Sequence, residues 1–274
     1  MAMSSDDIGS IADEAFSLLG SGLQTSPFST RYQNFTVEEA YRVTRLVRRF
    51  REQRGEHAIG RKIGFTNRTI WPQYNVYAPI WGHMYDATVF DLDALHRGFS
   101  LHGLPEPRIE PEIVFHLAKA PTRGMRDVDL LGCVDWFAHG FEFVQSLFPG
   151  WRFAPADTIA AFGLHGAYLI GPRYEVGAPS ETWVNALSTF EIELARNGEL
   201  AARGHASDVL DGPLSALAHL NDLLTADPDS PALTAGEIIT TGTLTAALPV
   251  VPGETWSTTF SGIELAGISV SLKA

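Results

Sequence analysis

The segment from Arg108 to Phe115 constrains the fold of this chain more than any other. Its β-branched and aromatic residues are typical of a strand. Because side chains alternate between the two faces of a strand, Glu110 and Glu112 share one face, about 7 Å apart along the backbone. Pro111 between them has no backbone N–H, so we expect this segment at a sheet edge or a bulge. The alternative for this pair alone is a solvated edge strand with two exposed glutamates.

A second strand-like segment, His139 to Gln145, contains Glu142 as its only carboxylate among aromatic and aliphatic neighbours. A buried carboxylate needs a partner. Three carboxylates from two strands form an oxygen-rich site of the kind that holds Mg²⁺ or Mn²⁺. The sequence therefore predicts Glu110, Glu112 and Glu142 as metal ligands.

A second Glu-x-Glu pair, Glu191 and Glu193, provides an internal comparison. It leads into Asn197-Gly198, a dipeptide typical of a type I′ hairpin turn. We expect these two carboxylates to be solvated on a hairpin and to bind no metal.

Several further motifs follow one another in a recognisable order. They are Gly60 to Thr66 (GRKIGFT), Trp151 followed by Asp157-Thr158, Gly212 to Leu217 (GPLSAL), and Thr241 to Thr245 (TGTLT). Together with the EPEIVF and GFEFV segments, they resemble the 2-keto-4-pentenoate hydratase and 4-oxalocrotonate decarboxylase branch of the fumarylacetoacetate hydrolase superfamily. The resemblance runs from about Gly60 to the C-terminus.

The resemblance implies an α+β fold, a mixed β-sheet roll with a small helical N-terminal part. We expect the helical part at residues 1–57 and a β-rich catalytic domain at 58–274, or one continuous domain. In this family the three matching glutamates bind a divalent metal, Mg²⁺ or Mn²⁺. The resemblance also implies a homo-oligomer.

Other residues acquire expected roles from their motifs. Lys62 matches an active-site cation, the alternative being a surface lysine whose stem covers apolar neighbours. Thr243 lies in a Gly-Thr loop that can bind a substrate carboxylate, the alternative being simple strand termination. Trp81, in an aromatic segment expected to form an ordered loop or lid over residues 71–91, and Phe162 are expected to contact the substrate.

The sequence departs from the family after Pro79, where an acidic residue proposed as the acid–base group is replaced by Ile80. Nearby polar residues that offer a replacement are His83, Asp86 and Glu106. His83 is our first candidate, because histidine titrates near neutral pH.

Composition limits the class of partner. The 274 residues carry a net charge of −12, which argues against nucleic acid and anionic membranes as general partners. The single cysteine excludes an internal disulfide. Neither a signal peptide nor an apolar run of spanning length is evident, so we expect a cytoplasmic protein.

The resemblance, together with the predicted metal ligands, implies metal-dependent chemistry on a small anionic 2-oxo acid or its 2-hydroxydienoate form. Hydration of a 2-hydroxypenta-2,4-dienoate-type substrate is the first interpretation. The alternatives are decarboxylation of a 2-oxo diacid, C–C hydrolysis of an acylpyruvate, and a non-catalytic protein that only binds 2-oxo acids.

Overall fold

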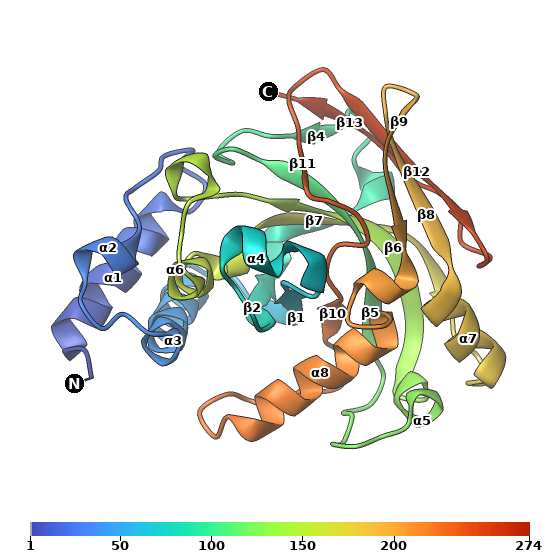
Figure 1. The fold of residues 1–274 in the computed structure, drawn as a ribbon, viewed down its shortest axis with the longest axis horizontal. Coiled ribbons are helices and arrows are strands. Elements are labelled where there is room, and N and C mark those ends of the chain that lie inside the picture. Colours follow the sequence, from blue (N-terminus) through green and yellow to red (C-terminus); the bar gives the residue numbers. More distant parts are fainter. Residues whose placement is uncertain (1) are drawn as a thin grey trace.

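The computed structural model describes residues 2–274, which form two β-sheets flanked by helices (Figure 1). The larger sheet has eight strands in the order β2-β1-β10-β5-β6-β7-β3, and the short β11 pairs with β5. The smaller sheet has five strands in the order β4-β13-β12-β8-β9. Both sheets are mixed, because β1–β10, β3–β7 and β4–β13 are parallel pairs among antiparallel ones. The predicted α+β class with a mixed sheet is confirmed.

The bounds of the elements are as follows. The larger sheet contains β1 (Ala58–Gly64), β2 (Ile80–Tyr85), β3 (Val89–Asp91), β5 (Arg108–Leu117), β6 (Val134–Val144), β7 (His165–Glu175), β10 (Ile238–Thr240) and β11 (Leu248–Pro249). The smaller sheet contains β4 (Phe99–Ser100), β8 (Glu191–Arg196), β9 (Glu199–His205), β12 (Thr255–Ser261) and β13 (Ser269–Lys273). The α-helices are α1 (Ser5–Leu18), α2 (Phe28–Arg31), α3 (Val37–Gln53), α4 (Trp71–Tyr74), α5 (Asp127–Leu131), α6 (Pro155–Ala160), α7 (Glu181–Thr189) and α8 (Pro213–Ala226). Short 3₁₀ turns include η5 (Phe162–Leu164).

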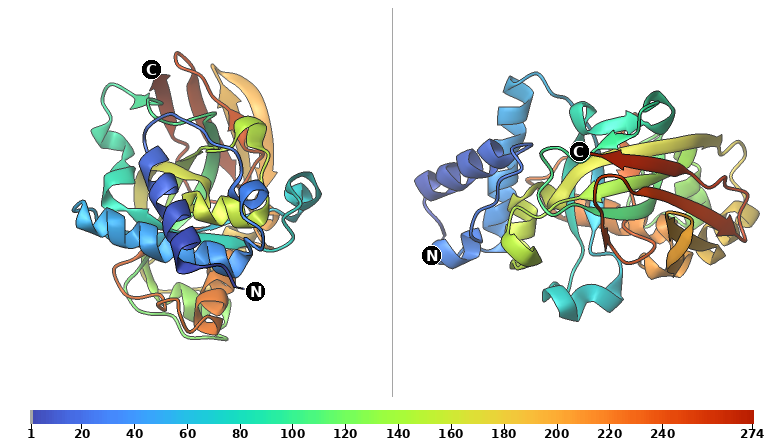
Figure 2. Two further views of the ribbon diagram at one scale, coloured as in Figure 1. Left: turned by 90° about the vertical axis from the view of Figure 1, so that its left-hand side faces the viewer. Right: turned by 90° about the horizontal axis from the view of Figure 1, so that it is seen from above.

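The N-terminal helices begin at side-chain caps. Ser4 accepts a hydrogen bond from the N–H of Asp7, and Thr36 accepts one from the N–H of Glu39, which satisfies donors that have no partner within the helix. The apolar faces of α1 and α3 share one hydrophobic cluster with α6 and with residues that follow β6. Figure 2 shows these helices gathered at one end of the sheets. No helix within residues 2–274 has the length and apolarity needed to cross a membrane.

Strand β5 is an interior strand, so the expectation that Pro111 lies at an edge or bulge was wrong. The strand pairs with β6 along its whole length, and Pro111 faces Phe141. On its other side, β10 pairs with residues 114–116 and β11 with residues 108–109. Pro111 lies in the gap between them, where its carbonyl accepts a hydrogen bond from Leu244 N at 2.9 Å. Since no strand fills this gap, no backbone hydrogen bond between strands is lost through the missing N–H of Pro111. The Thr241–Thr245 loop lies beside the glutamates here, where Gly242 contacts Glu112.

The expectation of a loop or lid over residues 71–91 was also largely wrong. Residues 80–85 form β2, which pairs antiparallel with β1, and residues 89–91 form β3. The segment before β2 does contribute to a pocket through Ile70 and Tyr74. The strand assignment matters because it fixes which side chains of this segment face the site.

Candidate active site

The pairing of β5 with β6 brings the three predicted glutamates together. Glu110 lies directly opposite Glu142, and Glu112 lies opposite Gly140. One carboxylate oxygen from each of the three lies within 4.8 Å of the others. Glu112 and Glu142 are fully buried, whereas Glu110 is half-buried and lines a pocket.

The carboxylates of this trio fit a divalent cation. Glu112 Oε2 accepts a hydrogen bond from Gly242 N at 3.1 Å, but Glu112 Oε1 is buried with no hydrogen-bond partner among residues 2–274. A buried carboxylate oxygen without a donor is costly unless a cation binds it. Oxygen atoms from carboxylates are the ligands that Mg²⁺ and Mn²⁺ prefer.

Lys62 projects from β1 into the same site. Its Nζ lies 3.1 Å from Glu142 Oε2 and donates a hydrogen bond to Gly163 O at 3.0 Å. Only 3% of the residue is exposed, so it is not a surface lysine. Burial opposes the charged ammonium, but the three carboxylates, Glu142 first among them, raise the pKa of Lys62.

The surroundings shift the pKa values of the three carboxyl groups in different directions. Burial raises the pKa of Glu110 to about 7, although Lys62 opposes this shift. Burial and the neighbouring Glu142 raise the pKa of Glu112 well above its usual range. Burial also acts against the charged form of Glu142, but Lys62 and His165 hold its pKa below the usual value. Glu142 is therefore held ionised by the Lys62 ammonium and by its hydrogen bond with His165, while burial favours the protonated forms of Glu110 and Glu112.

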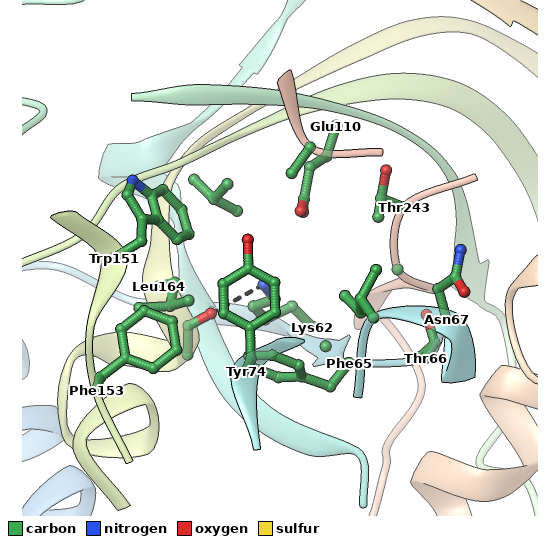
Figure 3. Close-up of a pocket in the computed structure, with 16 residues that line it drawn as sticks. Lys62, Phe65, Thr66, Asn67, Tyr74, Glu110, Trp151, Phe153, Leu164 and Thr243 are labelled. Atoms are coloured by element: carbon green, nitrogen blue, oxygen red, sulfur yellow. Dashed lines mark hydrogen bonds between the residues drawn. The ribbon is translucent and has the colours of Figure 1, made fainter. Parts of the chain in front are cut away.

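A pocket opens beside Glu110 and Lys62. It is lined by Lys62, Gly64, Phe65, Thr66, Asn67, Ile70, Tyr74, Glu110, Val144, Trp151, Phe153, Gly163, Leu164, Gly242, Thr243 and Ala247. In Figure 3, Glu110, Thr243 and Asn67 lie toward one side, and Trp151, Phe153 and Leu164 lie toward the other. The pocket thus has a polar end at the trio and an aromatic end away from it.

Tyr74 lies between these two ends. Its ring stacks on Phe153 at 5.7 Å between centroids, and its hydroxyl accepts a hydrogen bond from Arg108 Nη1 at 2.9 Å. The Arg108 guanidinium lies 4.1 Å from the centroid of the Trp151 ring. Arg108 and Glu110 are two residues apart on β5 and so share a face.

The model of the family described as fumarylacetoacetate (FAA) hydrolase C-terminal matches residues 95–267, more than half of the chain. The chain belongs to the fumarylacetoacetate hydrolase family. It is 30% identical to 2-hydroxyhexa-2,4-dienoate hydratase of Comamonas testosteroni over 90% of this chain and 91% of that protein. It is 29% identical to 4-oxalocrotonate decarboxylase of Pseudomonas sp. strain CF600 over 85% of this chain and 84% of that protein.

A solved structure of 4-oxalocrotonate decarboxylase from Pseudomonas putida G7, complexed with magnesium and adipate, matches with a TM-score of 0.87. The match covers 99% of each chain at 25% identity. The family fold therefore extends over the helical N-terminal part as well as the sheets.

Trp81 and His83, the two predicted site residues on β2, lie outside the pocket. Ile80 and Gly82 pair with Gly64 and Lys62 on β1, and so share the pocket-facing side with them. His83 is three residues from Ile80, so it faces the other way, as does Trp81. Both line a separate cavity against α3, where Trp81 stacks on Tyr41. Burial and nearby Arg61 also lower the pKa of His83 well below its usual value. The structure does not support His83 as the acid–base group or Trp81 as a substrate contact.

Two other acidic candidates also lie elsewhere. Glu106 is exposed, and its Oε1 accepts hydrogen bonds from Gln24 Nε2 and from the N–H of Gly150. It joins surface loops and does not line the pocket. Asp86 is exposed and accepts a hydrogen bond from the N–H of His57.

The two remaining substrate candidates differ in placement. Phe162 packs in the N-terminal hydrophobic cluster, and only the next two residues of η5 line the pocket. Thr243 does line the pocket, but its hydroxyl donates to Thr245 O at 2.9 Å. The same hydroxyl oxygen accepts a hydrogen bond from Thr245 N at 3.4 Å, so both contacts lie within its own loop.

No local sequence pattern indicated a role for His165 or Tyr74 at the site. His165 begins β7 and is buried, with Nδ1 2.8 Å from Glu142 Oε1 and Nε2 3.0 Å from Thr88 Oγ1. It therefore holds the Glu142 carboxylate from the side opposite Lys62. Its contact with Glu142 depends on the register of β6 against β7, which no local pattern contains.

The comparison pair behaves as predicted. Glu191 and Glu193 are exposed on β8, and Glu193 forms an ion pair with Arg203 on β9. Asn197 and Gly198 have φ values of 53° and 82°, as a type I′ turn requires. The buried trio and this exposed pair thus share a sequence pattern but not an environment.

Proposed function

We propose that this protein is a divalent-metal-dependent lyase that adds water to a 2-hydroxypenta-2,4-dienoate-type acid, giving a 4-hydroxy-2-oxo acid. The observation that carries the proposal is the buried trio of carboxylates beside Lys62 at the polar end of a pocket. Relatives named as 2-hydroxydienoate hydratases support this assignment over most of the chain.

Glu110, Glu112 and Glu142 would hold the metal ion, Mg²⁺ or Mn²⁺. When bound, such an ion acts as a Lewis acid toward the carboxylate and 2-oxygen of the substrate. One divalent cation and Lys62 together balance the three carboxylates, so the site carries no net charge before an anionic substrate binds. Lys62 then orients the substrate oxygen, while Gly163 O and Glu142 fix the position of its ammonium.

The aromatic end of the pocket favours a substrate with one carboxylate. Lys62 is the only cation among the lining residues within positions 2–274, and Glu142 already pairs with it. A second carboxylate at the end formed by Phe153, Trp151 and Leu164 would lose water without gaining a partner. An uncharged alkenyl tail would bury apolar surface there instead.

Decarboxylation of a 4-oxalocrotonate-type diacid is the second candidate. It is favoured by the likeness over 99% of the chain to a decarboxylase structure that contains magnesium and adipate. Arg108 contacts Tyr74 and Trp151 but does not line the pocket, and it would have to be uncovered to bind the second carboxylate.

The test is turnover of both substrates by the Mg²⁺-loaded protein. We expect 2-hydroxypenta-2,4-dienoate to be consumed, as measured by loss of its ultraviolet absorbance and by nuclear magnetic resonance of the 4-hydroxy-2-oxo product. Removal of metal with a chelator should stop the reaction. CO₂ release from 4-oxalocrotonate, without hydration of the dienoate, would replace the first candidate with the second. Turnover of neither would contradict both.

The homo-oligomer and the cytoplasmic location expected from the sequence remain part of this proposal. The first rests on the family resemblance, and the second rests on the sequence features given above. Light scattering coupled to size-exclusion chromatography measures the first, and cell fractionation measures the second.

A further inference from the structure

The hydration that we propose needs a group that delivers a proton to carbon, and Ile80 cannot supply it. The alternatives near it in sequence, His83, Asp86 and Glu106, all lie outside the pocket. The proton donor must therefore be sought among the titratable side chains that line the pocket within residues 2–274. These are Lys62, Glu110 and Tyr74.

Two of these three groups have other partners. Lys62 Nζ is held between Glu142 and Gly163 O. Glu110 belongs to the carboxylate trio and faces Glu142 directly. Tyr74 is the titratable group that remains, and it approaches the pocket from α4, on a different wall from the trio.

The surroundings of Tyr74 leave its proton available. The phenol oxygen accepts a hydrogen bond from Arg108 Nη1 at 2.9 Å, and the hydroxyl donates to no acceptor among residues 2–274. The ring is fixed by stacking on Phe153 and by an edge contact with Phe65. In Figure 3 the hydroxyl points into the space between Trp151 and Glu110. A substrate anchored at the trio would extend its tail toward this hydroxyl.

Arg108 provides what a tyrosine needs in order to release a proton. Its guanidinium donates directly to the phenol oxygen. Stacking on Trp151 holds the guanidinium in place. Negative charge that develops on the oxygen is therefore met by an oriented, charge-assisted hydrogen bond.

We propose that Tyr74 is the general acid that protonates the terminal carbon of the dienol, with Arg108 as its positioning residue; this inference rests on the proposed function. The O–H bond of Tyr74 breaks as a C–H bond forms at the terminal carbon, with the electron pair drawn from the dienol π system. The 2-hydroxyl loses its proton as the carbonyl forms, and that proton returns through solvent to the phenolate. Water then adds across the remaining C=C bond.

The test compares Tyr74→Phe with wild type. This change removes one oxygen and keeps the ring that stacks on Phe153. We expect kcat for the dienoate to fall by about 10²–10³-fold, the usual contribution of a general acid, while KM changes by less than about threefold. The dissociation constants of Mg²⁺ and of 2-oxobutanoate, measured by calorimetry, should be unchanged. Tyr77→Phe is the matched control, because Tyr77 lies in the same segment and is 62% exposed.

Arg108→Met provides a second measurement. It should lower kcat less than Tyr74→Phe does, by about tenfold, and the double variant should be no slower than Tyr74→Phe alone. A kcat of Tyr74→Phe within about threefold of wild type would overturn the inference. So would a loss confined to KM and ligand binding, since it would assign Tyr74 to packing. Failure of the wild-type protein to act on the dienoate would overturn the proposed function first, and is seen without any variant.

Discussion

Glu110 and Glu142 lie directly opposite one another on adjacent antiparallel strands, in the interior of the larger sheet. Like charges in this position destabilise a sheet unless a cation separates them. Lys62 is one such cation, and it contacts Glu142 and not Glu110 in the structure. The geometry leaves Glu110 and Glu112 in need of a second positive charge, which is the basis of the metal site that we predict.

The first prediction concerns substitution of each glutamate by glutamine, which keeps shape and removes charge. Glu110→Gln, Glu112→Gln and Glu142→Gln should each weaken Mg²⁺ binding by more than the roughly 10–100-fold typical of an outer-shell partner. Titration calorimetry measures this. Glu191→Gln and Glu193→Gln are the matched controls and should bind Mg²⁺ like wild type. Equal losses in both sets would mean that the wrong pair of glutamates was chosen.

Without metal, the same variants should differ in thermal stability. Burial disfavours the ionised form of Glu112, so Glu112→Gln should keep or raise the melting temperature of the metal-free protein. Glu142 is held ionised by Lys62 and His165, so Glu142→Gln leaves a buried ammonium unpaired and should lower it. Differential scanning fluorimetry in a chelator distinguishes these outcomes, and a common direction for both variants would contradict the assigned charges.

The second prediction is that Mg²⁺ affinity rises with pH. The pKa of Glu110 is raised to about 7 in the folded chain from 4.5. The folded state therefore binds more protons than the unfolded state between those values, and metal-free stability should fall as pH rises through that window. Because the metal binds the deprotonated carboxylate, affinity should increase about tenfold between about pH 6 and about pH 8. Calorimetry in buffers of different ionisation enthalpy should also detect proton release. A flat pH dependence would argue against Glu110 as a ligand.

The third prediction separates Lys62 from the metal. Lys62→Met keeps the length and apolar stem but removes a charge that opposes the substrate oxyanion. We expect kcat/KM to fall by about 10²–10³-fold, as for loss of an oxyanion donor. Mg²⁺ affinity should be equal or higher, because a neighbouring positive charge is gone. The exposed Lys119→Met serves as control, and near-normal kinetics in Lys62→Met would reduce Lys62 to a structural partner of Glu142.

The fourth prediction concerns His165, which positions Glu142 through a 2.8 Å contact. His165→Ala should weaken Mg²⁺ binding by about 10–100-fold. His165→Gln, whose amide can still donate to Glu142, should recover part of that loss. His219→Ala is the control, since His219 is exposed on α8. No difference between the alanine and glutamine variants would indicate that His165 only fills space.

Local patterns in the sequence were sufficient for part of the site. Alternation along a strand correctly placed Glu110 and Glu112 on one face, and the Gly-Thr loop does contact the trio through Gly242. The same alternation explains the error at His83. In the loop that we expected, residues three positions apart would have no fixed relative orientation. In strand β2, the same offset places the side chains of Ile80 and His83 on opposite faces.

Other features depend on strand pairing and on packing, which local patterns do not contain. The expectation that Pro111 lies at a sheet edge was wrong because Pro111 lies in a gap between two partner strands. In such a gap, as at an edge, no neighbouring strand requires its backbone N–H. The Tyr74–Arg108 hydrogen bond joins residues 34 positions apart and required the tertiary fold. His165 is likewise defined only by the register of β6 against β7.

We propose that Glu110, Glu112 and Glu142 hold one divalent cation that anchors a 2-oxo acid. A crystal grown with Mn²⁺ and pyruvate tests it most directly through the anomalous scattering of manganese. We expect one strong peak within about 2.5 Å of an oxygen from each of the three carboxylates, with pyruvate beside it on the Lys62 side of the pocket. A peak at Glu191 and Glu193, or pyruvate bound away from the trio, would contradict it.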